Sequence, residues 1–459
     1  PGANPHQINL KNRNISSHIE NNQIILTSAV GNIVLQQPLS YQTENGMKRI
    51  IQNAYSKSDD NSYHFDVKTY AKEKELLIDP AVYFASFSGS TDDNWGFTAT
   101  YDDQGNLYNA GNVFGIGYPV TAGAYKTTFS GIVDVSITKY NYNGSSLTYS
   151  TYLGGSNIES PHSIVVTANR ELVVFGSTSS IDFPTTASAY DKTYNGGTAV
   201  IADNILDYTV GSDLFVTKLN AAGSALVGST LIGGNKNDGL NDEYNLAKLY
   251  YNYGDIFRGE VIVDANGNPI IATTTSSTDF PIVGGFQNTF AGGTHDAVVM
   301  KFNNNLSSLT WSTFIGGNGT DAAYSVQFDS KGDLYVTGGS QSVNLPTTAG
   351  ALNITPQGDI DGYIAHLSSN GNSLLACTYI GTAAYDQCYF VQTDINDNVF
   401  VYGQSLGAYP VFPSGVYNNA NSHQFIHKLN SSLSTTIFST VFGSGSANTD
   451  LVPSAFLVN

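Results

Sequence analysis

The sequence predicts an all-β fold: a β-propeller of four-stranded blades, five complete and a sixth partial, preceded by a small β domain. Three observations lead to this prediction. The composition favours strands and turns, because 459 residues include 29 Tyr, 23 Phe and 46 Gly but only 2 Met. One phrase recurs six times in the chain. No helical period separates its copies, and repeated four-stranded units are typical of propellers.

The charge balance excludes some partners. Lys and Arg number 19 and Asp and Glu number 37, which gives a net charge of −18 at pH 7. We therefore expect no nucleic acid partner, and no anionic membrane as the main partner. No run of 18 apolar residues occurs, so we expect no direct membrane insertion as a helix. The chain begins at Pro1, which we interpret as a processed form or an excerpt of a longer protein.

Residues 1–80 are predicted to form the small β domain, which ends near Asp79-Pro80. We interpret its start as cut from a longer sheet. Residues 24–35 alternate as a hairpin, with Gly31-Asn32 as its turn. The segments 63–68 and 76–79 add further strands.

The recurrent phrase reads Thr-Tyr-Ser-Thr-Tyr-Leu-Gly-Gly at 148–155 and Thr-Trp-Ser-Thr-Phe-Ile-Gly-Gly at 310–317. Its aligned glycines are Gly89, Gly154, Gly233, Gly316, Gly381 and Gly443. They divide the propeller, predicted over 81–459, into repeats of about 90–153, 154–232, 233–315, 316–380 and 381–442, with a partial blade at 443–459.

Three other phrases recur in the same order between the glycines and complete each unit. One is a strand, an Asp/Gly turn and a second strand, as in 325–338. Another is an X-Pro loop. The last is a strand opened by Asp and ending in Thr-Lys, as in 213–218. With the recurrent phrase, these give four short strands per unit.

Both ends of the repeat region carry half blades. Residues 81–88 resemble a last, outer strand without a blade before it, and 450–459 resemble a first, inner strand without a blade after it. We expect a sixth blade that is incomplete within this sequence.

These phrases resemble the SBBP-type β-propeller repeat of large secreted proteins, over about residues 81–459. The segment 1–80 is similar to the β domain that precedes such propellers in surface proteins of Bacteroidota-type bacteria. The resemblance implies an extracellular, cell-surface protein, exported by type IX secretion as are relatives with a type B sorting domain, and associated with adhesion or gliding motility. It implies no catalytic residues.

Two insertions depart most from the repeat, at 193–212 and 235–257. Extra surface on a rigid scaffold is where binding residues concentrate, and tyrosines stack on sugars or pack against proteins. The alternative is that the second insertion packs onto its neighbouring blade. The candidate partner-binding residues are Asp238, Asp242, Glu243, Tyr244, Tyr250, Tyr251 and Tyr253.

No cofactor is predicted, although two sets of residues have side chains that could bind Ca²⁺. The strand-opening Asp134, Asp213, Asp296 and Asp361 could line a channel, but recurrence at one offset favours a structural cap. Segments 264–268 and 394–398 resemble the start of a calcium loop but fall on the repeat's hairpin turn, so we expect plain turns.

Other chemical motifs are weak. His423 and His427 share a strand face, but substitution within the repeat is the simpler interpretation. The whole chain holds four Arg, two of them in the propeller, which argues against a sialidase-type arginine clamp. Cys377 and Cys388 fall on different predicted strands, and the sequence leaves their bonding open.

The leading functional hypothesis is a non-enzymatic surface module for adhesion or protein–protein recognition, in a secretion or gliding-motility assembly. Its partners would be a surface protein or glycan, including components of an outer-membrane secretion or motility complex. The alternative is a polysaccharide-active enzyme with carboxylates in a propeller cleft. Two Asp or Glu facing each other about 5–10 Å apart in a cleft would favour the enzyme.

Overall fold

The structure is a computed structural model of the chain and describes residues 4–8, 10–11, 16–28, 31–35, 37–44, 47–58, 62–79, 89–241, 249–252, 254–446 and 451–458. The chain divides into two units, Pro1–Ser86 and Phe87–Asn459. Besides two 3-10 turns, η1 (Pro5–Gln7) and η2 (Asp255–Phe257), the regular elements of the described residues are strands, which confirms the predicted all-β class. Among these residues, no helix has the length and apolar character needed to cross a membrane.

The first unit contains three antiparallel three-stranded sheets, ordered β1-β8-β7, β2-β3-β4 and β6-β5-β9. Ile24, Tyr63 and Phe65 lie at its core. The strands are β1 (Leu10–Lys11), β2 (Ser16–Glu20), β3 (Gln23–Ser28), β4 (Gly31–Leu35), β5 (Leu39–Glu44), β6 (Met47–Ile51), β7 (Asn53–Lys57), β8 (Ser62–Val67) and β9 (Leu77–Asp79).

The hairpin predicted over 24–35 forms from β3 and β4, but Gly31-Asn32 is not its turn. Ser28 pairs with Gly31, so both predicted turn residues already belong to β4, and residues 29–30 lie outside the described residues. The register follows from burial, because Ile24 and Leu26 must both face the core and a one-residue slip would expose them.

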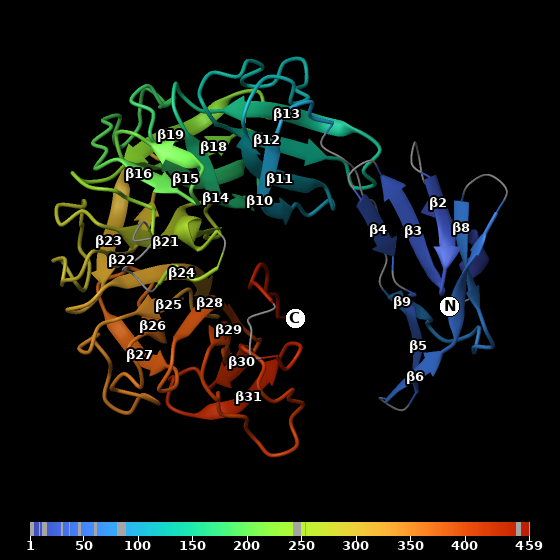
Figure 1. Cartoon of the computed structure of the whole chain (residues 1–459). Coiled ribbons are helices and arrows are strands. Elements are labelled where there is room, and N and C mark those ends of the chain that lie inside the picture. Colours follow the sequence, from blue (N-terminus) through green and yellow to red (C-terminus); the bar gives the residue numbers. More distant parts are fainter. Residues whose placement is uncertain are drawn as a thin grey trace. The chain divides into compact units, whose positions relative to one another are not determined.

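The second unit contains five antiparallel four-stranded sheets, blades 1 to 5, arranged in chain order around a centre (Figure 1). This confirms the predicted propeller of four-stranded blades. A short hairpin of β16 (Val200–Ala202) and β17 (Leu206–Tyr208) lies in the first insertion. The blade strands are β10 (Asn94–Tyr101), β11 (Leu107–Val113), β12 (Asp134–Tyr140) and β13 (Leu147–Leu153); β14 (Glu159–Val166), β15 (Leu172–Thr178), β18 (Asp213–Leu219) and β19 (Leu226–Ile232); β20 (Glu260–Val263), β21 (Pro269–Thr275), β22 (Asp296–Phe302) and β23 (Leu309–Ile315); β24 (Asp321–Phe328), β25 (Leu334–Ser340), β26 (Asp361–Leu367) and β27 (Leu374–Ile380); and β28 (Asp386–Thr393), β29 (Val399–Ser405), β30 (Gln424–Leu429) and β31 (Thr436–Phe442).

The apolar core lies between the faces of adjacent blades. One cluster joins Phe175 of blade 2 to Val298 of blade 3, and another joins Val299 of blade 3 to Val336 of blade 4. Middle strands are therefore covered on both faces, and every residue of β15 is buried. This explains why the apolar runs of the sequence do not alternate.

The recurrent glycines lie directly against buried aspartate side chains where adjacent blades meet, and there is no room for a Cβ at these positions. At Gly233, a Cβ would lie 2.7 Å from Asp213 Oδ1 of blade 2 and 2.7 Å from Oδ2 of Asp238, just before blade 3. At Gly316, a Cβ would lie 2.5 Å from Asp296 Oδ1. Only glycine fits at such distances. The Gly-Gly phrase therefore marks the junctions between blades.

The predicted half blades have different outcomes. Residues 81–88 lie outside the described residues, and 451–458 form no strand. The latter segment follows blade 5: Gln424 Nε2 donates to the carbonyl of Leu451 at 3.0 Å, and Phe456 packs against Tyr402 with ring centroids 5.7 Å apart. Within residues 89–446 and 451–458, no sixth four-stranded sheet forms.

Candidate functional site

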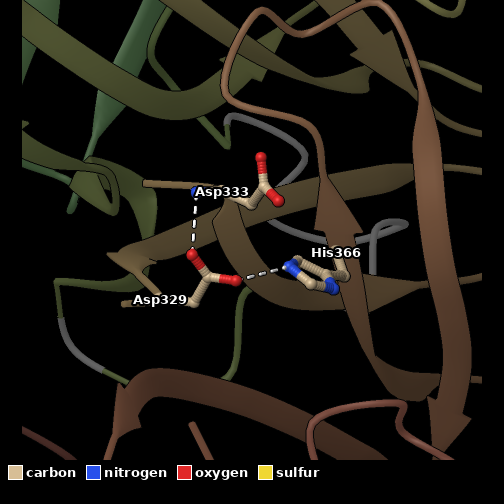
Figure 2. A group of neighbouring side chains, drawn as sticks. All are labelled: Asp329, Asp333 and His366. Carbon is tan, nitrogen blue, oxygen red and sulfur yellow. Dashed lines mark hydrogen bonds and ion pairs between the residues drawn. The ribbon is translucent and has the colours of Figure 1, made fainter. Parts of the chain in front are cut away.

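The turn between the first two strands of blade 4 fixes one carboxylate through the backbone. Oδ1 of Asp329 accepts hydrogen bonds from the backbone N–H groups of Lys331 and Asp333, each at 2.8 Å. Gly332 closes the turn with a left-handed backbone, at φ +84°. Such local bonds are typical of Asp in turns. They leave Oδ2 of Asp329 facing β26, the third strand of the blade (Figure 2).

His366 on β26 faces that oxygen. Its Nε2 lies 3.4 Å from Asp329 Oδ2. The pairing of β25 with β26 sets His366 opposite Tyr335, and the two rings stack with centroids 4.1 Å apart and planes 17° apart. This stacking and the strand register hold the imidazole toward the turn.

Asp333 completes a set of three side chains, which we call the blade 4 cluster (Asp329, Asp333 and His366). One ligand atom from each residue lies within 4.8 Å of the other two. Asp333 Oδ1 accepts a hydrogen bond from the backbone N–H of Ser369 at 2.8 Å. The side chains of Asp329 and His366 are 4% and 13% exposed, so water screens the cluster only weakly. Two carboxylates and an imidazole can hold a metal ion or move protons.

The same turn in the other blades makes an ordinary ion pair. In blade 3, Asp264 Oδ2 accepts from Asn268 Nδ2 at 2.8 Å and contacts Lys301 Nζ at 2.9 Å. Blades 1 and 5 repeat this set, and blade 2 keeps a lysine–carboxylate contact of 3.7 Å between Lys218 and Glu171. The sets of blades 1 and 5 are Asp102, Asn106 and Lys139, and Asp394, Asn398 and Lys428.

The electrostatics of the two kinds of turn differ. Burial raises the pKa of Asp264, but hydrogen bonds from Asn268 and the contact with Lys301 outweigh it, so the net pKa is lowered. In blade 4, burial lowers the pKa of His366 despite the nearby Asp329. The imidazole is therefore neutral at neutral pH and does not replace the lysine charge.

A groove of about 500 Å³ opens beside the cluster, between blades 4 and 5. Both Asp329 and His366 reach its wall. The turn of blade 5 borders it through Asp397, which accepts hydrogen bonds from N and Oγ of Ser330 at 2.8 and 2.7 Å. Other lining residues are Lys331, Tyr335, Thr348, Ser431, Ser432 and Ser434. The volume is within the range of ligand pockets, and the wall is rich in hydroxyl groups.

Sequence reasoning missed this cluster, although the signal was present. In the aligned repeats, position 333 reads Asp where three other blades read Asn, and position 366 reads His where the other four read Lys. Each change alone looks like ordinary repeat variation. Only the pairing of the strands shows that both changes act on the same carboxylate.

Of the predicted partner-binding residues, the structure describes Asp238, Tyr250 and Tyr251. Asp242, Glu243, Tyr244 and Tyr253 lie outside the described residues. Asp238 is fully buried and accepts from the backbone N–H of Gly234 at 2.8 Å, so it is a structural cap.

The two tyrosines that are described lie at a second hollow. The Tyr250 hydroxyl donates to Asp203, and the Tyr251 ring lies 4.9 Å from that of Tyr385. With Asp359 they line a hollow of about 380 Å³. Binding of a partner there remains a prediction.

The described part of the second insertion packs across the inner strands of several blades. Leu249 is fully buried against Tyr324 of β24 and Tyr389 of β28. Phe257 packs against Phe97 of β10, with ring centroids 5.5 Å apart. The apolar side chains of this segment need cover, and the inner strands provide it. The described residues of the second insertion thus pack onto the propeller, as in the alternative interpretation, but they contact several blades rather than one.

The strand-opening aspartates act as caps. Oδ2 and Oδ1 of Asp213 accept from the backbone N–H groups of Asn195 and Gly196 at 2.7 and 2.9 Å. Their equivalents Asp134, Asp296 and Asp361 also accept backbone N–H groups. The turns at 264–268 and 394–398 are the ion-paired turns described above, as the sequence predicted.

The remaining candidates have structural partners. His427 contacts the Tyr409 hydroxyl through Nδ1 at 2.7 Å and Thr436 through Nε2 at 2.9 Å, so it does not share a metal with His423. Cys377 and Cys388 are buried free thiols.

The two propeller arginines lie in separate ion pairs. Arg170 binds Asp103 at 2.7 Å at the surface, and Arg258 binds Asp255 at 2.7 Å in the interior. In the described residues, the propeller therefore shows no arginine cluster.

Comparisons with known proteins give a domain match and distant fold similarities. Residues 1–81 match a domain of unknown function, DUF7948. No curated protein matches the chain. Among solved structures, the NanB sialidase of Streptococcus pneumoniae (K499G mutant) is similar at 10% identity and a TM-score of 0.39, over 91% of this chain and 80% of that one. The phage phi92 endosialidase is similar at 12% identity and a TM-score of 0.34, over 79% of this chain and 60% of that one.

These comparisons correct the leading functional hypothesis. The solved structures named above are enzymes, a sialidase and an endosialidase, which does not agree with a non-enzymatic adhesion or recognition module. At these scores the similarity transfers no residue and no substrate to this chain, so the site is argued from its own side chains.

Proposed function

We propose that the propeller is a polysaccharide-active hydrolase whose reaction centre is the blade 4 cluster. One observation carries the proposal: one oxygen atom of Asp329, one of Asp333 and one ring nitrogen of His366 lie within 4.8 Å of one another, and Asp329 and His366 line an open groove. Paired carboxylates about 5 Å apart are the arrangement that cleaves glycosidic bonds in many enzymes. The sequence predicted such a pair as the mark of an enzyme, although it did not name these residues.

The groove supports a polyhydroxylated substrate. Its wall offers hydroxyl groups of Ser431, Ser432 and Ser434 from the loop between β30 and β31, and the ammonium group of Lys331. The serine hydroxyls can donate to and accept from sugar hydroxyls, and the ammonium group can donate to them. The groove is partly open to solvent, so part of a longer chain could enter it.

At a separation of about 5 Å, one carboxylate would attack the glycosidic carbon while the other, in its protonated form, gives its proton to the leaving oxygen. Water would then cleave the glycosyl–enzyme bond and return a proton to the second carboxyl group of the cluster. Its groups are held by backbone bonds, strand pairing and ring stacking, so little ordering is needed at the moment of reaction. The neutral imidazole of His366 and the carboxylate of Asp333 can each accept a proton.

The test is release of reducing ends from a panel of polysaccharides by the full chain. Asp333→Asn places in blade 4 the residue that blades 1, 3 and 5 carry at this position, so it should fold. We expect it to lower the rate at least 100-fold. Asp394→Asn, at the equivalent turn of blade 5, is the matched control and should retain the rate. A panel left intact by the unaltered chain, or an Asp333→Asn variant of equal rate, would refute the proposal.

A further inference from the structure

Blade 4 lacks both groups that stabilise the turn carboxylate in its neighbour. In blade 5, Oδ2 of Asp394 accepts from Asn398 Nδ2 at 2.9 Å and contacts Lys428 Nζ at 2.8 Å. In blade 4 these positions hold Asp333 and His366. In their place, the imidazole Nε2 of His366 lies 3.4 Å from Asp329 Oδ2. A second negative charge has replaced an amide, and an imidazole has replaced an ammonium group.

The imidazole is available as a ligand. Its Nε2 is shielded from solvent and makes no hydrogen bond within the described residues, and it faces the Asp329 carboxylate at 3.4 Å. A buried polar atom without a partner is costly, and so are two facing carboxylates. One positive ion placed between them would satisfy all three groups.

We propose that Asp329, Asp333 and His366 bind one divalent first-row transition metal ion, for which Zn²⁺ is the best match. Imidazole nitrogen with carboxylate oxygen suits Zn²⁺, whereas Ca²⁺ and Mg²⁺ prefer oxygen alone. A tetrahedral Zn²⁺ with bonds of about 2.0–2.2 Å holds its ligand atoms roughly 3.3–3.6 Å apart. His366 Nε2 and Asp329 Oδ2, which are 3.4 Å apart, already have this separation. The Asp333 carboxylate lies within 4.8 Å of both groups and would move closer by up to roughly 1.3 Å.

The site would keep an open position. Three protein ligands leave a fourth place for water or substrate, as in catalytic rather than structural zinc sites. The groove borders Asp329 and His366, so this place is reachable from solvent. A coordinated water with a lowered pKa would be a nucleophile for the proposed hydrolysis. Metal binding itself does not depend on that proposal, because it follows from the three ligands alone.

The experiment is calorimetric titration of the full chain with Zn²⁺, Ca²⁺ and Mg²⁺ in separate runs. We expect one equivalent of Zn²⁺ to bind, and Ca²⁺ and Mg²⁺ to bind at least 100-fold more weakly. The double substitution Asp333→Asn and His366→Lys recreates the set of blades 3 and 5, so the turn should stay folded. It should weaken Zn²⁺ binding at least 100-fold, with the thermal unfolding temperature checked in parallel.

A surface histidine provides the control. His18→Gln removes an exposed imidazole that lies 3.7 Å from Glu20 and should leave the Zn²⁺ affinity unchanged. Absence of Zn²⁺ binding, equal binding by the double variant, or tighter binding of Ca²⁺ than Zn²⁺ would each overturn the site. Zn²⁺ binding without polysaccharide cleavage would keep the metal site and refute only the proposed function.

Discussion

The turns of blades 4 and 5 share one pattern of backbone hydrogen bonds and differ in the two side chains that contact Oδ2 of the turn aspartate in blade 5. In both, the first Asp of the turn accepts the N–H groups two and four residues later, at 2.8 to 2.9 Å. In blade 5, Asn398 donates a hydrogen bond to Oδ2 of Asp394, and Lys428 forms an ion pair with the same oxygen, so the charge of the carboxylate is neutralised. Blade 4 adds a carboxylate and a neutral imidazole. Two positions of the repeat therefore decide whether the turn aspartate lies in an ion pair or beside a carboxylate and an imidazole, without a new loop.

The strongest test of this comparison transfers the blade 4 set to blade 5. The double substitution Asn398→Asp and Lys428→His should create a second Zn²⁺ site beside Asp394, because the turn and strand register are the same. We expect a second equivalent of Zn²⁺ by calorimetry, with an affinity at least 100-fold above that of Asn398→Asp alone. If no second equivalent appears, the ligand set does not suffice and features of blade 4 outside it are required.

The stability of the two kinds of turn should differ as well. Asp264→Ala in blade 3 leaves the largely buried Lys301 without its partner, and the cost should be about 2 kcal/mol of unfolding free energy. Asp329→Ala leaves only neutral His366 and relieves Asp333, so we expect a smaller loss, below about 1 kcal/mol. Denaturant unfolding of both variants, without added metal, measures the difference. Equal losses would mean that the blade 4 turn is an ordinary ion pair.

The opposite end of the blades should respond to pH. Burial raises the pKa of Asp296 to about 8 and that of Asp213 to about 7. Unfolded carboxyl groups ionise near pH 4, so between pH 4 and 8 the folded chain binds more protons than the unfolded chain. The unfolding free energy should therefore fall as pH rises through this range, by up to about 1.4 kcal/mol per pH unit for each such group.

Asp296→Asn should flatten that dependence, because the amide does not titrate. Exposed Asp207→Asn, in the β16–β17 hairpin, is the control and should leave the slope unchanged. Urea unfolding at several pH values is the measurement. A slope as steep in Asp296→Asn as in the unaltered chain would exclude Asp296 as a source of the pH dependence.

The smallest effect is expected from Asp333→Asn alone. Without metal, it removes a carboxylate facing Asp329 and supplies an amide donor like Asn398. We expect a gain of about 0.5–1 kcal/mol in unfolding free energy. Added Zn²⁺ should reverse the order, since binding stabilises only the unaltered chain. An Asp333→Asn variant less stable than the unaltered chain without metal would contradict the repulsion on which the comparison rests.

Much of the fold could be predicted because the same strand and turn signals occur in repeat after repeat. Glycines such as Gly233 and Gly316 recur where blades meet, and the Asp-x-x-Gly turns recur where hairpins close. The first unit has no such repetition. There the sequence wrongly predicted a turn at Gly31-Asn32, although both residues belong to β4.

The site could not be found in the same way. Asp333 and His366 are 33 residues apart, and each occupies a repeat position whose usual residue is structural. The insertion at 235–257 drew attention because it was long and rich in tyrosine, yet its described part mostly fills space between inner strands. A departure in length is easy to see in a sequence, whereas a departure in side-chain pairing needs the register of the strands.

The most direct test of the central claim is an anomalous difference map from a crystal of the full chain soaked in Zn²⁺, recorded at the zinc absorption edge. The account predicts a peak bounded by Asp329, Asp333 and His366, and none at the equivalent turns of blades 1, 3 and 5. A map with no peak at blade 4, or with equal peaks at the ion-paired turns, would contradict it.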